Sequence, residues 1–173
     1  MWIRRALVLD PHIRRVGFAA FGNHQLVDWG IRMLPESSLK TRVARALVPC
    51  LVALLDDHNP SVLVLPKTGK SSFRRSARVA RGVAVIAQEA AKRGIPVVFM
   101  SHGQVRDAFR AITGKRRVSK ASINRVIVDR YPELAATLPR LRRVWDPEQH
   151  YTPLFNAVSM YLAWRHPPLI AET

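Results

Sequence analysis

The sequence has very little cysteine, few acidic residues and no long apolar run. Cys50 is the only cysteine among 173 residues, so no disulfide bond can form within the chain, which excludes a small secreted domain built on disulfides. No stretch approaches the roughly 18 consecutive apolar residues of a membrane-spanning helix. The first ten residues are too weakly apolar for a signal peptide and suit a strand, so we expect a cytoplasmic protein.

The scarcity of acids makes the chain strongly basic. Twelve Asp and Glu stand against 28 Lys and Arg, which gives a net charge of +16 and an isoelectric point near 11.5. Hydrophobic residues make up 48% of the chain, which excludes disorder and allows one domain over residues 1–173. Such a charge attracts phosphate backbones through counterion release. Because the basic residues are spread through segments predicted to fold, nucleic acid is favoured over a membrane surface.

Apolar periodicity predicts an α/β domain. Strands are expected at 6–9, 15–21, 25–32, 62–65 and 95–100, and helices at 37–57, 71–93, 103–112, 119–130, 133–138 and 152–166. The Gly22-Asn23 break predicts a hairpin, so the first three strands form an antiparallel meander. The later strands alternate with helices and are expected to be parallel. This order of a mixed sheet flanked by helices resembles the ribonuclease H-like fold.

The segment after the fourth strand imitates a phosphate-binding P-loop. Gly69-Lys70-Ser71 matches the second half of that motif, but Val64 stands where its first glycine should be. Nothing later in the chain reads as a Walker B strand, so an NTPase is not expected. A basic loop before a helix still suits phosphate binding.

Three basic segments are candidates for nucleic-acid binding, at 67–81, 114–120 and 140–143. The first contains six cations and no acid, and its Phe73 is a candidate for stacking on bases or wedging between them. The alternatives are a solvated charged face and a Phe73 folded onto the core. The residues predicted to bind nucleic acid are Lys67, Lys70, Phe73, Arg74, Arg75, Arg78, Arg81, Lys115, Arg116, Arg117 and Lys120.

Asp10 is the first candidate for a catalytic or metal-binding residue. It follows a predicted buried strand, at the sheet end where α/β proteins bind ligands, and a carboxylate there suits Mg²⁺. The alternative is a turn-capping Asp before Pro11. Asp146, Glu148 and His150 form the other polar cluster near such a site, or simply a polar loop before a helix. None of the six histidines has the partner spacing of a structural zinc site.

The ordered segments resemble the RuvC family of Holliday-junction resolvases over nearly the whole chain. The resemblance rests on Leu7-Val-Leu-Asp10-Pro11 with Val16-Gly17-Phe18, on Asn59-Pro60 before Val62-Leu-Val-Leu65, on Ala80-Arg-Gly-Val-Ala84, on Lys120, and on Phe155-Asn-Ala-Val-Ser-Met-Tyr-Leu-Ala163. It implies a homodimer that cuts four-way DNA junctions with four acidic residues and Mg²⁺ or Mn²⁺.

The resemblance also implies that most of the acidic site has been replaced. Asp10 keeps the first carboxylate, whereas Pro66 takes the place of the second, and the last two fall near Pro153 and Asn156. One carboxylate does not ordinarily hold the two divalent ions of in-line hydrolysis. A relocated ligand set would consist of Asp10, Asp146, Glu148 and His150, with Asn156 as a weak carbonyl ligand.

The sequence therefore favours a RuvC-like protein that binds branched or structured DNA and whose nuclease activity is weakened or lost. A first alternative is an active, Mg²⁺-dependent junction endonuclease that uses the relocated ligands. A second is an RNA-binding or assembly protein that keeps only the fold. Mg²⁺ or Mn²⁺ is expected only if the protein is catalytically active.

Overall fold

The computed structural model describes residues 5–35, 43–69, 77–140 and 149–166. In chain order, the elements are β1 Arg5–Pro11, β2 Arg15–Gly22, β3 Gln25–Met33, α1 Val43–His58, β4 Val62–Pro66, α2 Ala77–Lys92, β5 Val97–Met100, α3 His102–Thr113, α4 Lys120–Arg130, the 3-10 helix η2 Pro132–Thr137, and α5 Thr152–Arg165. This order confirms the predicted succession of elements.

The strands form one mixed sheet in the order β3-β2-β1-β4-β5. Strands β1, β2 and β3 pair antiparallel, and the β2–β3 hairpin turns at Asn23 and His24, which both have positive φ angles. β4 pairs parallel to β1, and β5 pairs parallel to β4. The predicted meander followed by parallel strands is therefore confirmed.

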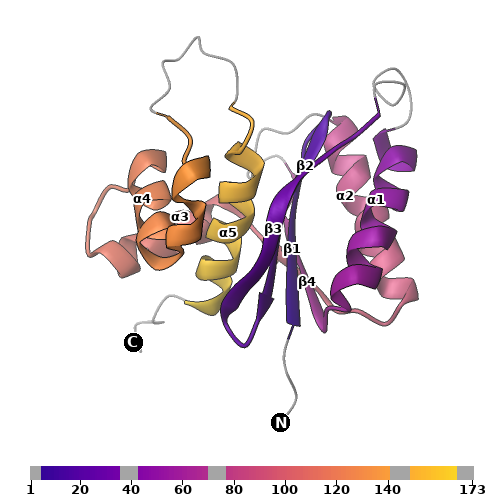
Figure 1. The fold of residues 1–173 in the computed structure, drawn as a ribbon, viewed down its shortest axis with the longest axis horizontal. Coiled ribbons are helices and arrows are strands. Elements are labelled where there is room, and N and C mark those ends of the chain that lie inside the picture. Colours follow the sequence, from indigo (N-terminus) through magenta and orange to yellow (C-terminus); the bar gives the residue numbers. More distant parts are fainter. Residues whose placement is uncertain (1–4, 36–42, 70–76, 141–148, 167–173) are drawn as a thin grey trace.

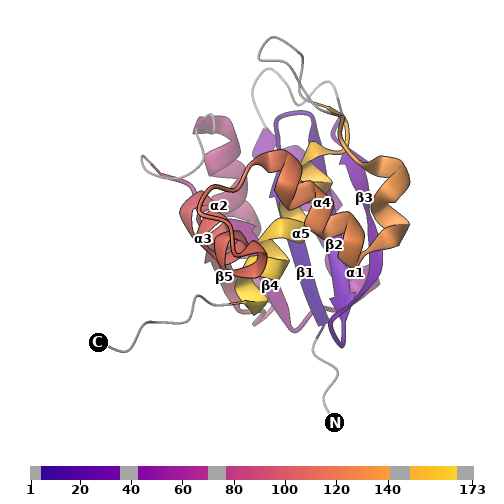
Figure 2. The ribbon, with the colours of Figure 1, turned by 90° about the vertical axis from the view of Figure 1, so that its left-hand side faces the viewer.

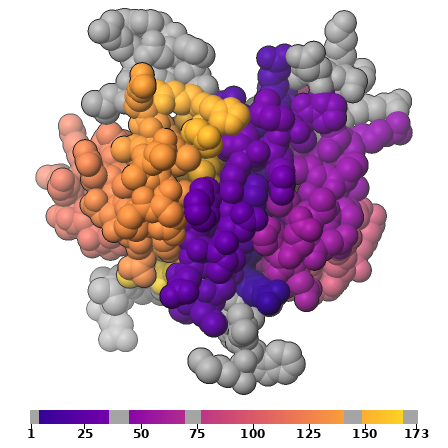
Figure 3. Space-filling model, viewed as in Figure 1, coloured from indigo at the N-terminus to yellow at the C-terminus, as the bar shows by residue number. Residues whose placement is uncertain are grey.

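The sheet lies between two layers of helices (Figure 1), with α1 and α2 on one face and α3, α4 and α5 on the other. The alternation of side chains along β1 produces this division, because Leu7 and Leu9 face the first layer whereas Ala6 and Val8 face the second. Figure 3 shows the N-terminal strands at the surface between the two layers. In the parts of the chain that the structure describes, no helix has the length and apolar character needed to cross a membrane.

Helix α5 is the central helix of its layer. It packs directly on β1 and β2, and α3 and α4 pack on its other side (Figure 2). Every residue from Thr152 to Ala163 except Asn156 is therefore buried. The sequence matches this position, since the helix is apolar all round apart from a few small polar residues.

The sequence places a helix stop at Gly94 and an N-cap at Thr152; the first prediction is confirmed and the second is corrected. Gly94 ends the α2 region with a φ of 68°, as expected of a helix stop. The α5 cap is Tyr151, not Thr152, and it makes no side-chain capping bond; Thr152 lies inside the first turn and is buried. The predicted helix starts near Ser37 and at Ser71 lie outside the described residues.

The start of α5 approaches β2 so closely that only glycine fits there. Gly17 lies opposite Asp10 in the β1–β2 pair, and a Cβ atom at Gly17 would lie 2.2 Å from the carbonyl carbon of Pro153. No side-chain adjustment relieves such a clash, because the atoms it meets belong to the backbone. Gly17 therefore allows α5 to begin directly over the end of β1.

We expect Gly17→Ala to destabilise the protein by about 2 kcal/mol or more, because the added methyl group must displace the α5 backbone. Chemical denaturation measures this change in the free energy of unfolding. Gly22→Ala in the same strand is the matched control, since its Cβ would make an ordinary 3.5 Å contact with Val27. Equal, small effects of the two substitutions would show that the approach at Gly17 is not a constraint.

Candidate functional site

Asp10 is a fully buried carboxylate at the end of β1, with a relative exposure of 0%. Asn156 of α5 donates a hydrogen bond from Nδ2 to its Oδ2 atom at 2.8 Å. Nε2 of His12 lies 2.8 Å from the same oxygen and donates a second hydrogen bond. Two side-chain donors thus hold one oxygen of the buried carboxylate, which offsets part of the cost of its burial.

The neighbouring strand presents no side-chain ligand at this level of the sheet. Val8 pairs with Val64, so Asp10 and Pro66 each lie two residues further along parallel strands. Pro66 is buried at the end of β4, and Pro153 is buried in the first turn of α5. Neither proline ring can bind a metal ion, and both occupy space next to the carboxylate's end of the sheet.

These residues do not fit the two-metal centre that the sequence resemblance implies. Divalent ions in such centres need several oxygen ligands, chiefly carboxylates. Within the described ranges, no group of three or more His, Cys, Asp or Glu residues is placed to hold a metal ion. At Asp10, the amide group of Asn156 and the ring of His12 both donate to Oδ2, and nitrogen donors cannot bridge to a cation.

The relocated ligand set stays a prediction. Asp146 and Glu148 lie outside the described residues. His150 is exposed, and its ring contacts Tyr151 edge to face at 4.9 Å between centroids. Among the candidate catalytic residues, the structure therefore joins Asn156 to Asp10.

His12 is the functional residue that sequence reasoning missed. The spacing of zinc ligands does not reveal His12, because this residue acts as a hydrogen-bond donor to an acid two residues earlier. The signal was present in Asp10-Pro11-His12, because the proline restricts the backbone between the two polar residues. Without the fold, nothing in that spacing distinguished a partner of Asp10 from a solvated loop histidine.

Asn156→Asp tests whether one restored carboxylate rebuilds a cation site. Two carboxylates in hydrogen-bonding contact repel each other, so we expect the variant to lose about 2 kcal/mol of stability at neutral pH in the presence of EDTA. Millimolar Mn²⁺ is expected to raise the thermal midpoint of the variant and not that of the wild type. Asn124→Asp on α4 is the control, and a Mn²⁺-dependent rise in the wild type would contradict this reading of the site.

The basic residues predicted to bind nucleic acid are exposed wherever the structure describes them. The exposed residues are Lys67, Arg78, Arg81, Lys115, Arg116, Arg117 and Lys120, whereas Lys70, Phe73, Arg74 and Arg75 lie outside the described ranges. Lys67 follows β4 directly, and its backbone N–H donates to Met100 O at the end of β5. Lys67 therefore lies at the same sheet edge as Asp10.

In the second basic segment, 114–120, the last residue, Lys120, lies at the sheet edge that carries Asp10. His102 begins α3 immediately after β5, and the charges of Arg106 and Lys120 both act on its imidazole. Lys120 therefore lies near the start of α3, at the end of the sheet where β1, β4 and β5 stop. Lys115, Arg116 and Arg117 precede it in the α3–α4 connection, which belongs to the outer helices and not to the sheet.

The third basic segment is anchored beside the same edge. The Gln149 side chain joins the backbone of Arg140, accepting from its N–H at 2.6 Å and donating to its carbonyl at 2.9 Å. Arg15, the first residue of β2, donates to the Gln149 carbonyl at 3.2 Å. Arg140 thus lies near the Asp10 end of the sheet, whereas residues 141–143 of this segment lie outside the described ranges.

The pKa of His102 provides a probe of this basic edge. Partial burial lowers the pKa below 6.5, and the charges of Arg106 and Lys120 lower it further. We expect Lys120→Gln to raise the pKa, because it removes one of these charges, and bound DNA to raise it more strongly. An NMR pH titration of the imidazole measures both changes. Lys92→Gln, at the far end of α2, is the control; a pKa unmoved by DNA would place the DNA elsewhere.

Comparison with known proteins agrees with the sequence resemblance. No family model matches the chain. Two curated relatives are crossover junction endodeoxyribonucleases RuvC. The protein of Rhodococcus opacus (strain B4) is 30% identical over 139 residues, covering 76% of this chain and 71% of the relative. The protein of Rhodococcus jostii (strain RHA1) is 28% identical over 145 residues, with the same two coverages.

Solved structures with a similar fold include two resolvases. Thermus thermophilus RuvC in complex with a Holliday junction substrate has a TM-score of 0.65 at 12% identity, over 94% of this chain and 93% of that one. The yeast mitochondrial Holliday junction resolvase Ydc2 has a TM-score of 0.63 at 12% identity, over 95% of this chain and 78% of that one.

The fold is thus that of the ribonuclease H-like resolvases, with a mixed five-stranded sheet between helices. The identity and coverage of the curated relatives decide the family. The chain belongs to the RuvC family.

Proposed function

We propose that this protein binds branched DNA along the sheet edge that carries Asp10 and that its nuclease activity is weakened or lost. The observation that supports a weakened or lost nuclease activity is the burial and hydrogen bonding of the Asp10 carboxylate. It is fully buried, and the nitrogen donors of Asn156 and His12 each form a hydrogen bond with its Oδ2 atom. A nuclease of this family requires oxygen ligands for metal ions at that position.

The DNA-binding half of the proposal rests on charge and on similarity. Lys67, Lys120 and Arg140 belong to three separate basic segments and lie at or near one edge of the sheet. Phosphate contacts by such residues supply most of the affinity of sequence-independent DNA binding. The similar Thermus thermophilus protein was solved with a Holliday junction, which supports a branched substrate for this chain as well.

A cleavage and binding assay on one labelled four-way junction tests both halves. We expect the protein to bind the junction more tightly than a linear duplex of the same sequence, and to leave it uncut in Mg²⁺ and in Mn²⁺. Symmetric cuts that Asp10→Asn abolishes, and that Asp107→Asn does not, would overturn the loss of activity. Asp107 is a suitable control because it is an exposed residue paired with Arg110. Equal affinity for junction and duplex would remove the preference for branched DNA.

The position of the binding surface is tested by a matched pair of double variants. Lys67→Gln with Lys120→Gln is expected to weaken binding and to reduce the slope of log affinity against log salt by about two. The control, Lys92→Gln with Arg93→Gln, removes the same number of charges at the end of α2 that lies away from the binding surface. It is expected to change neither the affinity nor the salt slope.

Structured RNA that outcompetes the junction by a wide margin would favour the RNA-binding alternative.

The assembly and location of the protein follow from the same proposal. We infer a homodimer, since a junction presents two equivalent strands and a two-fold symmetric protein can contact both. We also infer that the chain acts as one domain in the cytoplasm, where a basic protein without disulfides meets DNA.

A further inference from the structure

A second cluster of donor groups lies at the end of the sheet opposite Asp10. Strand β1 runs from Arg5 to Pro11, and Arg5 pairs with Gly22, the last residue of β2. Helix α5 begins over Asp10 and ends near the β2–β3 turn, so its last turn faces this second end (Figure 1). A pocket of about 630 Å³ opens here, lined by His24, Gln25, Leu26, Arg130, Tyr131 and Glu133.

The histidine of the hairpin turn is fixed in one tautomer by its neighbours. Nη2 of Arg165 lies 3.3 Å from Nε2 of His24, and because a guanidinium group only donates, Nε2 is the acceptor. Nδ1 therefore carries the proton and donates to the Tyr161 hydroxyl oxygen at 3.2 Å. The Tyr161 hydroxyl therefore accepts from His24, and its own hydrogen remains available to donate to another acceptor.

A second hydroxyl close by is buried without a hydrogen bond. Tyr131 is 5% exposed, and its OH group has no hydrogen-bond partner among the described residues. The side chain of Arg130 lies near enough to act on the pKa of Tyr131, although the pair does not meet hydrogen-bond geometry. Phe21 stacks on the Tyr161 ring at 3.5 Å and meets the Tyr131 ring edge-on at 5.8 Å, which holds the two rings together.

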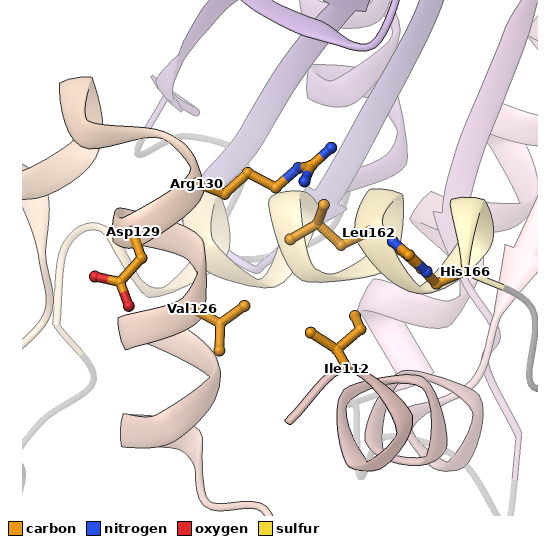
Figure 4. A pocket seen from close by; sticks show the side chains of 6 residues that line it. All are labelled: Ile112, Val126, Asp129, Arg130, Leu162 and His166. Carbon is orange, nitrogen blue, oxygen red and sulfur yellow. The ribbon is translucent and has the colours of Figure 1, made fainter. Parts of the chain in front are cut away.

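The cluster is rich in donors and poor in acceptors. Burial raises the pKa of both Tyr131 and Tyr161, so the two hydroxyls stay protonated at neutral pH. Neither Arg130 nor Arg165 forms an ion pair with a described residue. Figure 4 shows the neighbouring pocket, where the Asp129 carboxylate points away from the Arg130 guanidinium. Glu133 is the one acid that lines the 630 Å³ pocket.

We propose that this cluster is an anion site that binds a phosphate group through Arg130, Arg165 and the hydroxyl of Tyr131. Guanidinium groups recognise phosphate by paired N–H donors, and the buried hydroxyl gains the hydrogen bond it lacks. A tetrahedral anion with several acceptor oxygens can meet donors that arrive from the end of α4 and from the end of α5. The phosphate comes either from free phosphate compounds or from a DNA backbone.

An NMR titration with inorganic phosphate at constant ionic strength tests the site. The amides of residues 23–26, 130–133 and 165 are expected to shift together along one binding curve. Arg130→Gln and Tyr131→Phe are each expected to weaken phosphate binding by about tenfold, since each removes a donor to a charged group. Glu133→Gln is expected to tighten it, because it removes the repelling carboxylate. Arg125→Gln, an exposed residue on the same helix, is the control.

A second titration with four-way junction DNA distinguishes the two sources of phosphate. If the DNA backbone occupies the site, the junction shifts the same amides and phosphate competes with it. If free phosphate compounds occupy it, phosphate binds equally well to the protein saturated with junction. The site would be overturned if neither titrant shifts these amides, or if Arg130→Gln and Tyr131→Phe, folded as judged by their spectra, bind phosphate like the wild type. Failure to bind junctions at all would refute the proposed function and leave the phosphate result standing.

Discussion

The contact between the first turn of α5 and the backbone of β2 at Gly17 is the constraint on which the rest of the structure depends. It places Asn156 against Asp10, and it closes the end of the sheet over a carboxylate that would otherwise face solvent. The same contact aligns α5 along β1 and β2, so that α3 and α4 can pack on its outer side. One glycine thus decides the position of a helix and the environment of the site.

That environment explains how a buried carboxylate is stabilised at this end of the sheet. A cluster of carboxylates repels itself unless metal ions are bound, whereas one aspartate between an amide and an imidazole is satisfied by the protein alone. Pro66 and Pro153 place buried apolar rings at the end of β4 and in the first turn of α5.

The two ends of the sheet carry positive groups of different kinds. At the Asp10 end, the basic side chains are exposed, which suits the loose and salt-dependent contacts of a DNA backbone. At the opposite end, arginines and tyrosines surround a buried hydroxyl, which suits a single small anion.

The amino-acid sequence by itself determined the order of the elements and the class of the fold. These properties depend on local periodicity and on residue identity, so strands such as Val62–Pro66 and helix stops such as Gly94 could be predicted. Only the tertiary structure decided that His12 bonds to Asp10, and that Tyr131, Tyr161 and Arg165 meet at the hairpin turn. The physical reason is that such contacts are set by the packing of α5 and its neighbours on the sheet, which joins residues more than a hundred positions apart.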